Sequence, residues 1–511
     1  MTDAKKLFNN TLMLTLTAFI MRTVSVSFNV YLTNKIGAQG IGLFELINAV
    51  YATAVTFSVA GIRLASMRLV ADSMALGRSN QRCIMNRCLL YGFLCGAFIG
   101  GILYIGGNRI AASWIGNPQT GICLKILSVS LPFVSMSAAL NGYFTSAGKI
   151  MRYTFVQLLE QIFKIAVTVV LLNYASNKGM REACAAIVGG ISLAEMFSLT
   201  CSFSLYRIAS LKEKEKHKSG IWKSLFRIAL PDAVGSQMRS VLTTVEHLLI
   251  PKGLAKAGGS TQQAISTYGV IHGMSLPIVL YPSALLSSLS GLLVPEISSH
   301  YVSGRYKRIH YMIKRVIHLS LLFSIGTAGI MYYSADYLSV AFYGDNQAGF
   351  YIRVIAPLIP VMYMDMSVDG ILKGLDQQMS YMKYNIIDAT SCVVLVYFLV
   401  PIMSVKGYIF VIYISELINF VLSFRRLCVV SEVSVELFKD IIIPLLSVIS
   451  SCLCVWFFNN IFTLNLTAKM HAAVSIILCC IIYFTMLRIF NAVDGEEMKW
   501  LKNLFKGKRE L

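Results

Sequence analysis

The sequence predicts an all-α integral membrane protein with about fourteen transmembrane helices. Only 14% of its 511 residues are charged and 56% are hydrophobic, whereas about a quarter of the residues in a soluble domain are charged. Apolar stretches of about 20 residues recur along the chain, and each is long enough to cross a bilayer as a helix. Barrel strands are about half as long and alternate in polarity, so helices are the expected spanning elements.

Fourteen stretches have the length and polarity of a membrane helix. They are residues 7–33, 41–62, 84–107, 119–147, 153–175, 182–206, 224–250, 264–294, 311–335, 349–373, 381–402, 405–426, 438–460 and 469–490. Lys5 and Lys6 precede the first span as in a signal peptide, but the apolar stretch is longer than in a signal peptide and lacks a clear cleavage site. We therefore expect it to be retained as the first helix.

The basic residues predict the orientation. If the N-terminus is cytoplasmic, lysines and arginines on the cytoplasmic side outnumber those on the outer side by about three to one. We therefore expect a multi-pass protein of the cell membrane with both termini in the cytoplasm. The formal net charge is +20, but no basic stripe is interleaved with aromatic residues, and this argues against binding of nucleic acid.

The two halves of the sequence match at a nearly constant offset, which predicts an internal repeat. The matched pairs are Gly42 with Gly269, Gly77 with Gly304, Arg78 with Arg305, Pro132 with Pro360, Gly142 with Gly370, Tyr153 with Tyr381 and Glu160 with Asp388. The offset spans six helices, so the repeats share one orientation and are related by a pseudo-two-fold axis along the membrane normal. We predict six-helix lobes over residues 1–206 and 224–430, a cytoplasmic linker over 207–223 that contacts anionic lipids, and two helices with a cytoplasmic tail over 431–511.

Charged residues within the spans are candidates for a binding site, because a charge in the membrane needs a cavity or a partner. Arg22 lies midway along the first span. Its guanidinium either faces a central cavity and binds an anionic group such as a phosphate, or pairs with a carboxylate such as Glu45. Arg239 and Glu246 lie two turns apart on the seventh span and can face one cavity. His247 beside them either titrates near neutral pH or is a buried structural histidine.

Acidic residues within the spans predict an ion site. The candidate residues are Asp232, Asp365, Asp369, Asn385 and Asp388. Two of them, Asp365 and Asp369, lie one turn apart and suit a proton or a cation, and the other three offer oxygen ligands for a hard cation. The coupling ion would be Na⁺ or H⁺. Glu160 and Lys164 are also one turn apart, on the fifth span, and form either a structural pair or a functional site.

The sequence contains no motif that indicates catalysis. It has no phosphate-binding loop, no GxSxG or HExxH motif, and no spacing of cysteine and histidine that suits zinc. We therefore expect no enzymatic activity, no bound metal, and no cofactor other than a coupling cation.

Residues 37–78, GAQGIGLFELINAVYATAVTFSVAGIRLASMRLVADSMALGR, resemble the stage V sporulation protein B and polysaccharide biosynthesis family. This family belongs to the multidrug/oligosaccharidyl-lipid/polysaccharide (MOP) exporter superfamily. The most specific parts are GIGLF from Gly40 to Phe44 and GIRLA from Gly61 to Ala65. The resemblance implies a two-lobe, MATE-like flippase with a V-shaped central cavity, which moves lipid-linked sugar precursors of the cell envelope to the outer leaflet.

The same resemblance extends to single residues. Arg22 stands where related lipid II flippases place a cavity arginine, whereas Phe28 stands where those flippases usually carry another. Asp232, Asn385 and Asp388 lie on helices where some relatives bind sodium.

We therefore predict a flippase that moves a lipid-linked oligosaccharide or peptidoglycan precursor across the cytoplasmic membrane by alternating access. The predicted substrate-binding residues are Arg22, Glu45, Arg63, Arg239 and Glu246. The alternative is a multidrug or cation antiporter of the same superfamily, whose cavity should be lined by carboxylates and aromatic residues. A membrane glycosyltransferase would need long, acidic outer loops, which this sequence lacks. The expected partners are the lipid-linked saccharide and membrane lipids, and we expect a monomer.

Overall fold

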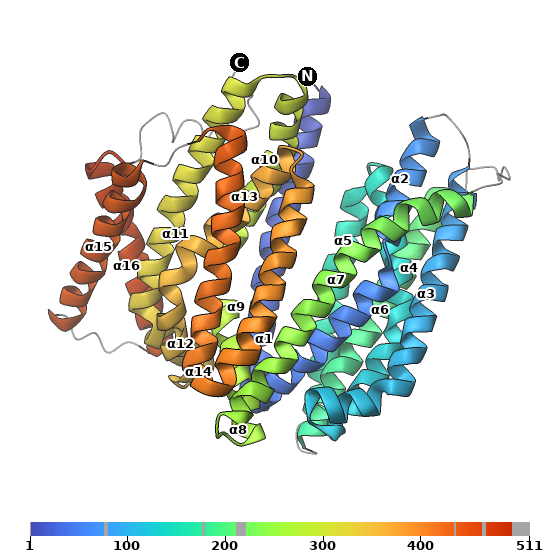
Figure 1. The fold of residues 1–511 in the computed structure, drawn as a ribbon, viewed down its shortest axis with the longest axis horizontal. Coiled ribbons are helices and arrows are strands. Elements are labelled where there is room, and N and C mark those ends of the chain that lie inside the picture. The colour runs from blue at the N-terminus through green and yellow to red at the C-terminus, as the bar shows by residue number, and fades with distance from the viewer. Residues whose placement is uncertain are drawn as a thin grey trace. The chain divides into compact units, whose positions relative to one another are not determined.

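The computed structural model describes residues 2–75, 80–175, 179–210, 221–433, 436–461 and 467–492. Side chains are described from Thr17 onward, apart from a few positions that include Asp232. Every regular element in these ranges is a helix (Figure 1), which confirms the predicted all-α fold. The chain forms two compact units. One comprises Lys35–Gly269, and the other comprises Met1–Asn34 together with Val270–Leu511.

Twelve of the fourteen predicted spans lie in segments that can cross a membrane, which is consistent with the predicted architecture. Ten segments of the described chain are long and apolar enough to cross a membrane. The two helices α1 (Thr2–Val59) and α14 (Gln378–Ser431) each contain two of the predicted spans. Predicted spans 224–250 and 264–294 fall outside the ten segments, in α7 (Ile221–Lys256) and in the stretch from α8 (Thr261–Tyr268) to α10 (Ser283–Val302).

Both long helices are interrupted by one residue with a non-helical backbone. In α1 this residue is Gly37, with φ 70° and ψ 177°. Glycine adopts positive φ without the steric cost that a Cβ brings. In α14 the residue is Ser404, with φ 53° and ψ −133°. Each interruption lies between two predicted spans, and Gly37 also lies close to the boundary between the two units.

The unit Lys35–Gly269 contains the second part of α1 and the helices up to α8. The further elements are α2 (Ile62–Ala75), α3 (Gln81–Ile110), η1 (Ala111–Ile115), η2 (Pro118–Thr120), α4 (Gly121–Ser146), α5 (Ile150–Ala175) and α6 (Met180–Ser210). Its core includes the buried side chains of Met85, Leu140, Tyr143 and Phe144. Hydroxyl groups join α1 to α7, because Thr53 is hydrogen-bonded to Ser240 at 3.1 Å and Thr244 donates to the Ala49 carbonyl at 2.9 Å.

The close packing of α3 on α4 depends on glycine, and it gives a testable prediction. A Cβ at Gly96 would lie 2.5 Å from the Cα of Pro132, whereas a Cβ at Gly101 would have no protein atom within 4 Å among the described residues. We expect Gly96→Leu to destabilise the protein by at least ~1–3 kcal/mol, because overpacking forces the helices apart. Thermal unfolding of the purified protein should show a lower midpoint for Gly96→Leu and an unchanged one for Gly101→Leu. Equal midpoints for the two variants would contradict the packing.

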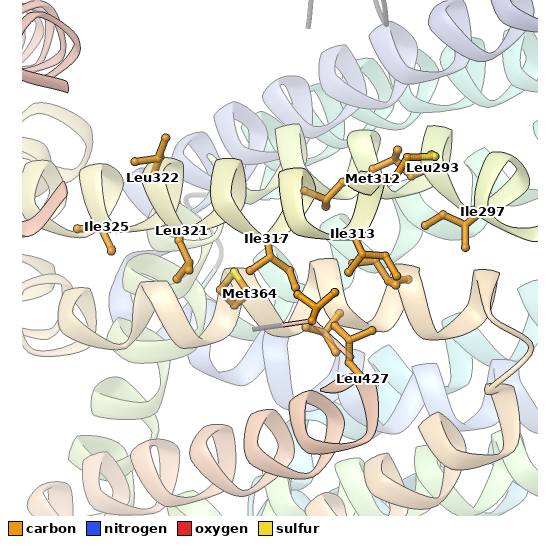
Figure 2. Close-up of a cluster of buried hydrophobic side chains, with 14 of the residues drawn as sticks. Leu293, Ile297, Met312, Ile313, Ile317, Leu321, Leu322, Ile325, Met364 and Leu427 are labelled. Carbon is orange, nitrogen blue, oxygen red and sulfur yellow. The ribbon is translucent and has the colours of Figure 1, made fainter. Parts of the chain in front are cut away.

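The other unit has its core between α10, α11 (Tyr306–Tyr343), α13 (Ile359–Gly374) and α14. Leu293 and Ile297 of α10, Ile313 and Ile317 of α11, and Met364 of α13 belong to one buried cluster (Figure 2). The shorter elements of this unit are η3 (Gly269–Ser275), α9 (Leu276–Val279), α12 (Gln347–Ile355) and η4 (Ala356–Leu358). The last elements are η5 (Leu437–Ile442), α15 (Ile443–Ile461) and α16 (Ala468–Ile489).

The two last helices are attached to α11 by buried polar contacts. The hydroxyl of Tyr483 on α16 donates to the Leu322 carbonyl at 2.7 Å. The Nδ1 atom of His318 on α11 lies 2.5 Å from Oδ1 of Asp440, and its Nε2 atom lies 2.9 Å from the Ala492 carbonyl oxygen. Carboxylate and carbonyl oxygens only accept, so both ring nitrogens are placed to donate, and a protonated His318 forms an ion pair with Asp440.

The boundaries of the two compact units differ from the boundaries of the predicted lobes. The first predicted span lies in the unit that holds the second half of the chain, and the seventh lies with the first half. The seventh span lies with the first half of the chain because α7 contacts the second part of α1. The predicted six-helix lobes and their pseudo-two-fold axis stay a prediction.

Candidate functional site

Arg22 lies on the first part of α1, and its side chain is exposed. Its neighbour Thr23 is hydrogen-bonded to the hydroxyl of Tyr281 at 3.0 Å, and the ring of Phe19 lies 6.0 Å from that of Tyr281. The guanidinium of Arg22 also lies within electrostatic range of the hydroxyl of Tyr363 on α13. Contacts on both sides of Arg22 therefore hold this stretch of α1 against the turn after α9, and leave the guanidinium accessible. The predicted alternative, an ion pair with Glu45, stays a prediction.

Tyr363 and Tyr281 were not among the predicted site residues. Tyr363 is completely buried, and its hydroxyl donates to the Val279 carbonyl at 2.5 Å. It therefore fixes the end of α9 next to Tyr281. No sequence pattern marks these two tyrosines, because they meet α1 only through the packing of distant segments.

Four carboxylates gather between α13 and α14. Asp365 and Asp369 lie one turn apart on α13, and Asp388 and Glu416 of α14 lie within electrostatic range of Asp365. The structure thus brings together three of the predicted ion-coupling residues and adds Glu416, which the sequence analysis missed. The available signal was its place midway along predicted span 405–426, where a carboxylate is costly.

Amide and hydroxyl groups complete this acidic cluster. The amide of Asn419 donates to Oδ2 of Asp365 at 2.8 Å, and the hydroxyl of Ser415 donates to Oδ1 of Asp388 at 2.5 Å. Asp365 and Asn419 are each 8% exposed. The Oδ1 atoms of both have no hydrogen-bond donor within the described part of the chain. These buried oxygens can only accept, so they suit a proton or a cation.

Two predicted members of the ion site are placed differently. The amide of Asn385 is buried and donates to the carbonyl of Tyr381 on its own helix at 2.9 Å. The side chain of Asp232 is outside the described residues. Among those residues, no three acidic, histidine or cysteine side chains are arranged as ligands of a metal ion.

A second cluster lies between α1, α7 and α8 in the unit Lys35–Gly269. The hydroxyl of Tyr268, which is 1% exposed, is hydrogen-bonded to Nδ1 of His247 at 2.8 Å. Glu45 and Glu246 both lie within electrostatic range of this hydroxyl. The structure thus brings these two predicted substrate-binding residues together around a tyrosine that was not predicted, and it gives His247 a buried partner.

The other two predicted arginines are exposed. Arg63 lies at the start of α2, within electrostatic range of Tyr153 on α5. Arg239 lies two turns before Glu246 on α7. Exposed guanidinium groups on helices that cross a membrane suit an anionic ligand, whereas the buried carboxylates suit a cation.

Residues 7–300, more than half of the chain, match the family described as "Polysaccharide biosynthesis protein". The chain belongs to this family. The predicted resemblance to this family is thereby confirmed.

Two curated relatives come from Bacillus subtilis (strain 168). Stage V sporulation protein B is 23% identical to this protein, over 97% of this chain and 98% of the relative. Sporulation protein YkvU is 21% identical, over 71% of this chain and 81% of the relative. The likeness to the first relative therefore covers nearly all of both chains.

Two solved structures show the fold that this chain shares. The lipid II flippase MurJ in an inward closed conformation superposes with a TM-score of 0.73 at 14% identity, covering 94% of this chain and 98% of that one. An inward-facing multidrug resistance MATE family transporter superposes with a TM-score of 0.63 at 11% identity, covering 83% and 99%. At these identities the likeness establishes the fold, which is MATE-like as predicted.

Proposed function

We propose that this protein is a flippase that moves a lipid-linked saccharide precursor across the cytoplasmic membrane by alternating access. The observation that carries the proposal is the exposed guanidinium of Arg22 in the middle of an apolar helix, in a chain with the fold of a lipid II flippase. A cation at this depth is costly unless it binds an anion. A lipid-linked precursor carries such an anion, a phosphate or diphosphate, between its lipid and its saccharide.

The proposed roles follow from charge and exposure. Arg22 binds the phosphate oxygens through its planar guanidinium, which can donate two parallel hydrogen bonds. Arg63 and Arg239 supply further positive charge for the anionic part of the substrate. Glu45 and Glu246, gathered around Tyr268, accept hydrogen bonds from saccharide hydroxyls, and the lipid tail stays in the bilayer.

The acidic cluster around Asp365 supports ion coupling. Its buried, acceptor-only oxygens bind Na⁺ or H⁺, and the release of the ion on the other side of the membrane drives the return of the empty transporter. Transport itself breaks no covalent bond, so the protein acts as a transporter and not as an enzyme. We further propose a monomer with both termini in the cytoplasm, as the distribution of basic residues predicts.

Depletion of the protein in its host tests this function. We expect the lipid-linked precursor to accumulate in the inner leaflet, where an added membrane-impermeant enzyme cannot reach it. Purified protein in proteoliposomes should then move a fluorescent polyprenyl-diphosphate saccharide between leaflets, and a matched lipid without the diphosphate should not move. Unchanged precursor pools together with altered efflux of cationic dyes would instead identify the drug antiporter.

A further inference from the structure

Three charged side chains meet between α5 and α6, apart from the residues assigned above. Glu160 and Lys164 are one turn apart on α5, and Glu195 is on α6. The ammonium of Lys164 interacts electrostatically with both carboxylates, and the two carboxylates interact with each other. Each residue lies about three turns or more from either end of its helix, so these three residues, the α5–α6 cluster, lie deep within their membrane-crossing segments.

The packing of α5 on α6 explains why these side chains meet. The rings of Phe163 and Phe197 stack with their centroids 4.4 Å apart. Further along, a Cβ at Gly190 would lie 2.1 Å from Oγ1 of Thr168. These two contacts define a close antiparallel register, in which the charged residues of α5 face Glu195.

A buried hydroxyl also lies at the α5–α6 cluster. Ser198 lies on α6 about one turn from Glu195, and it is 1% exposed. Its hydroxyl lies beside the carboxyl of Glu160, yet it has no well-formed hydrogen bond to any residue that the structure describes. A carboxyl group that gains and loses a proton would change the bonding of this hydroxyl.

Two other hydroxyl groups face the α5–α6 cluster. The hydroxyls of Tyr51 on α1 and Tyr153 on α5 lie within electrostatic range of both carboxylates. Tyr51 is hydrogen-bonded to Ser130 of α4 at 2.7 Å, and Tyr153 is within range of Arg63. These neighbours supply hydroxyl groups around the carboxylates.

We infer that Glu160, Lys164 and Glu195 form a proton-binding site. With all three groups ionised, the α5–α6 cluster carries one net negative charge, which is costly at this depth. Uptake of one proton from water, held between the two carboxylates, makes it neutral while Lys164 stays an ammonium. A proton needs only one carboxylate oxygen, whereas a hard metal cation needs several oxygen ligands, so we assign the site to a proton. Binding of the proton is independent of the proposed transport function, but its use in coupling rests on that function.

Infrared difference spectra of the purified, full-length protein in lipid nanodiscs test this site without any substrate. As the pH rises, the carbonyl stretch of a carboxylic acid should disappear as the proton leaves. Glu160→Gln and Glu195→Gln should each remove the same component of this signal, because the remaining carboxylate pairs with Lys164 and stays ionised. Glu182→Gln, the same change in the first turn of α6, should leave the signal intact. An unchanged signal in both Glu160→Gln and Glu195→Gln would overturn the inference.

Two further measurements keep the test independent of folding defects and of transport. In the unchanged protein, a hydrophobic carbodiimide, which reacts with protonated carboxyl groups, should label Glu160 or Glu195 at low pH and progressively less as the pH rises. Labelling of neither residue at low pH would contradict the site.

Lys164→Gln leaves two carboxylates without their ammonium, so its infrared signal should persist to higher pH. An intact infrared signal in a protein that fails the proteoliposome assay would refute the flippase and leave the proton site standing.

Discussion

Arg22→Ala is expected to lower the rate of precursor movement about ten- to a hundredfold, the equivalent of the ~1.5–3 kcal/mol of hydrogen bonds to a charged group. The guanidinium is exposed, so its loss removes a contact with the substrate and not a contact within the protein. The transport rate of Arg22→Lys should fall between the rates of the parent protein and of Arg22→Ala, because an ammonium keeps the charge but not the planar fork. The proteoliposome assay with a polyprenyl-diphosphate saccharide measures all three rates.

A structural role for Arg22 predicts a different result. If Arg22 paired with a buried carboxylate, Arg22→Ala would leave that charge uncompensated and lower the thermal unfolding midpoint. We expect an unchanged midpoint. Arg207→Ala serves as the matched control, because it also replaces an arginine by alanine. Arg207 lies in the last turn of α6, with its guanidinium 5.2 Å from the centre of the Phe203 ring. Full transport by Arg22→Ala would remove Arg22 from the mechanism.

Asp365→Asn is expected to lower transport about tenfold or more, ~1.4 kcal/mol or above in the barrier, and to abolish its dependence on an ion gradient. The substitution keeps the shape of the side chain and an oxygen that can accept the hydrogen bond from Asn419, so it removes mainly the charge. The measurement is the rate in proteoliposomes with an imposed Na⁺ or H⁺ gradient and without one. If the transport rate of the parent protein does not depend on either gradient, neither ion is coupled to transport.

Asp376→Asn is the control for that experiment. Asp376 follows α13, is exposed, and has a φ of 59°, a conformation that asparagine tolerates well. Its variant should retain both the rate and the response to the gradient. If Asp365→Asn and Asp376→Asn behave alike, the acidic cluster has no part in coupling.

The sequence was sufficient for the fold because each membrane helix is encoded locally. Length and polarity located even the paired spans within α1 and α14, where no polar loop separates them and a single residue, Gly37 or Ser404, interrupts the helix. The boundaries of the compact units were not encoded in this way. They depend on contacts between distant helices, such as the hydroxyl contacts of Thr53 with α7.

The candidate sites were predictable only within single helices. Spacing of one turn identified Asp365 with Asp369, and Glu160 with Lys164. Their partners Glu416 and Glu195 lie on other helices, and only the rotation and register of packed helices bring them close. The sequence analysis therefore found the charges but not the complete groups that they form.

The pairing of His318 with Asp440 has a consequence for how this family can diverge. Both side chains are buried, and loss of one would leave the other charge without a partner, a cost of about 3–5 kcal/mol. Exchange of both for apolar residues avoids that cost. Related sequences should therefore retain the two residues together or replace them together, and a chain with only one of them should be rare.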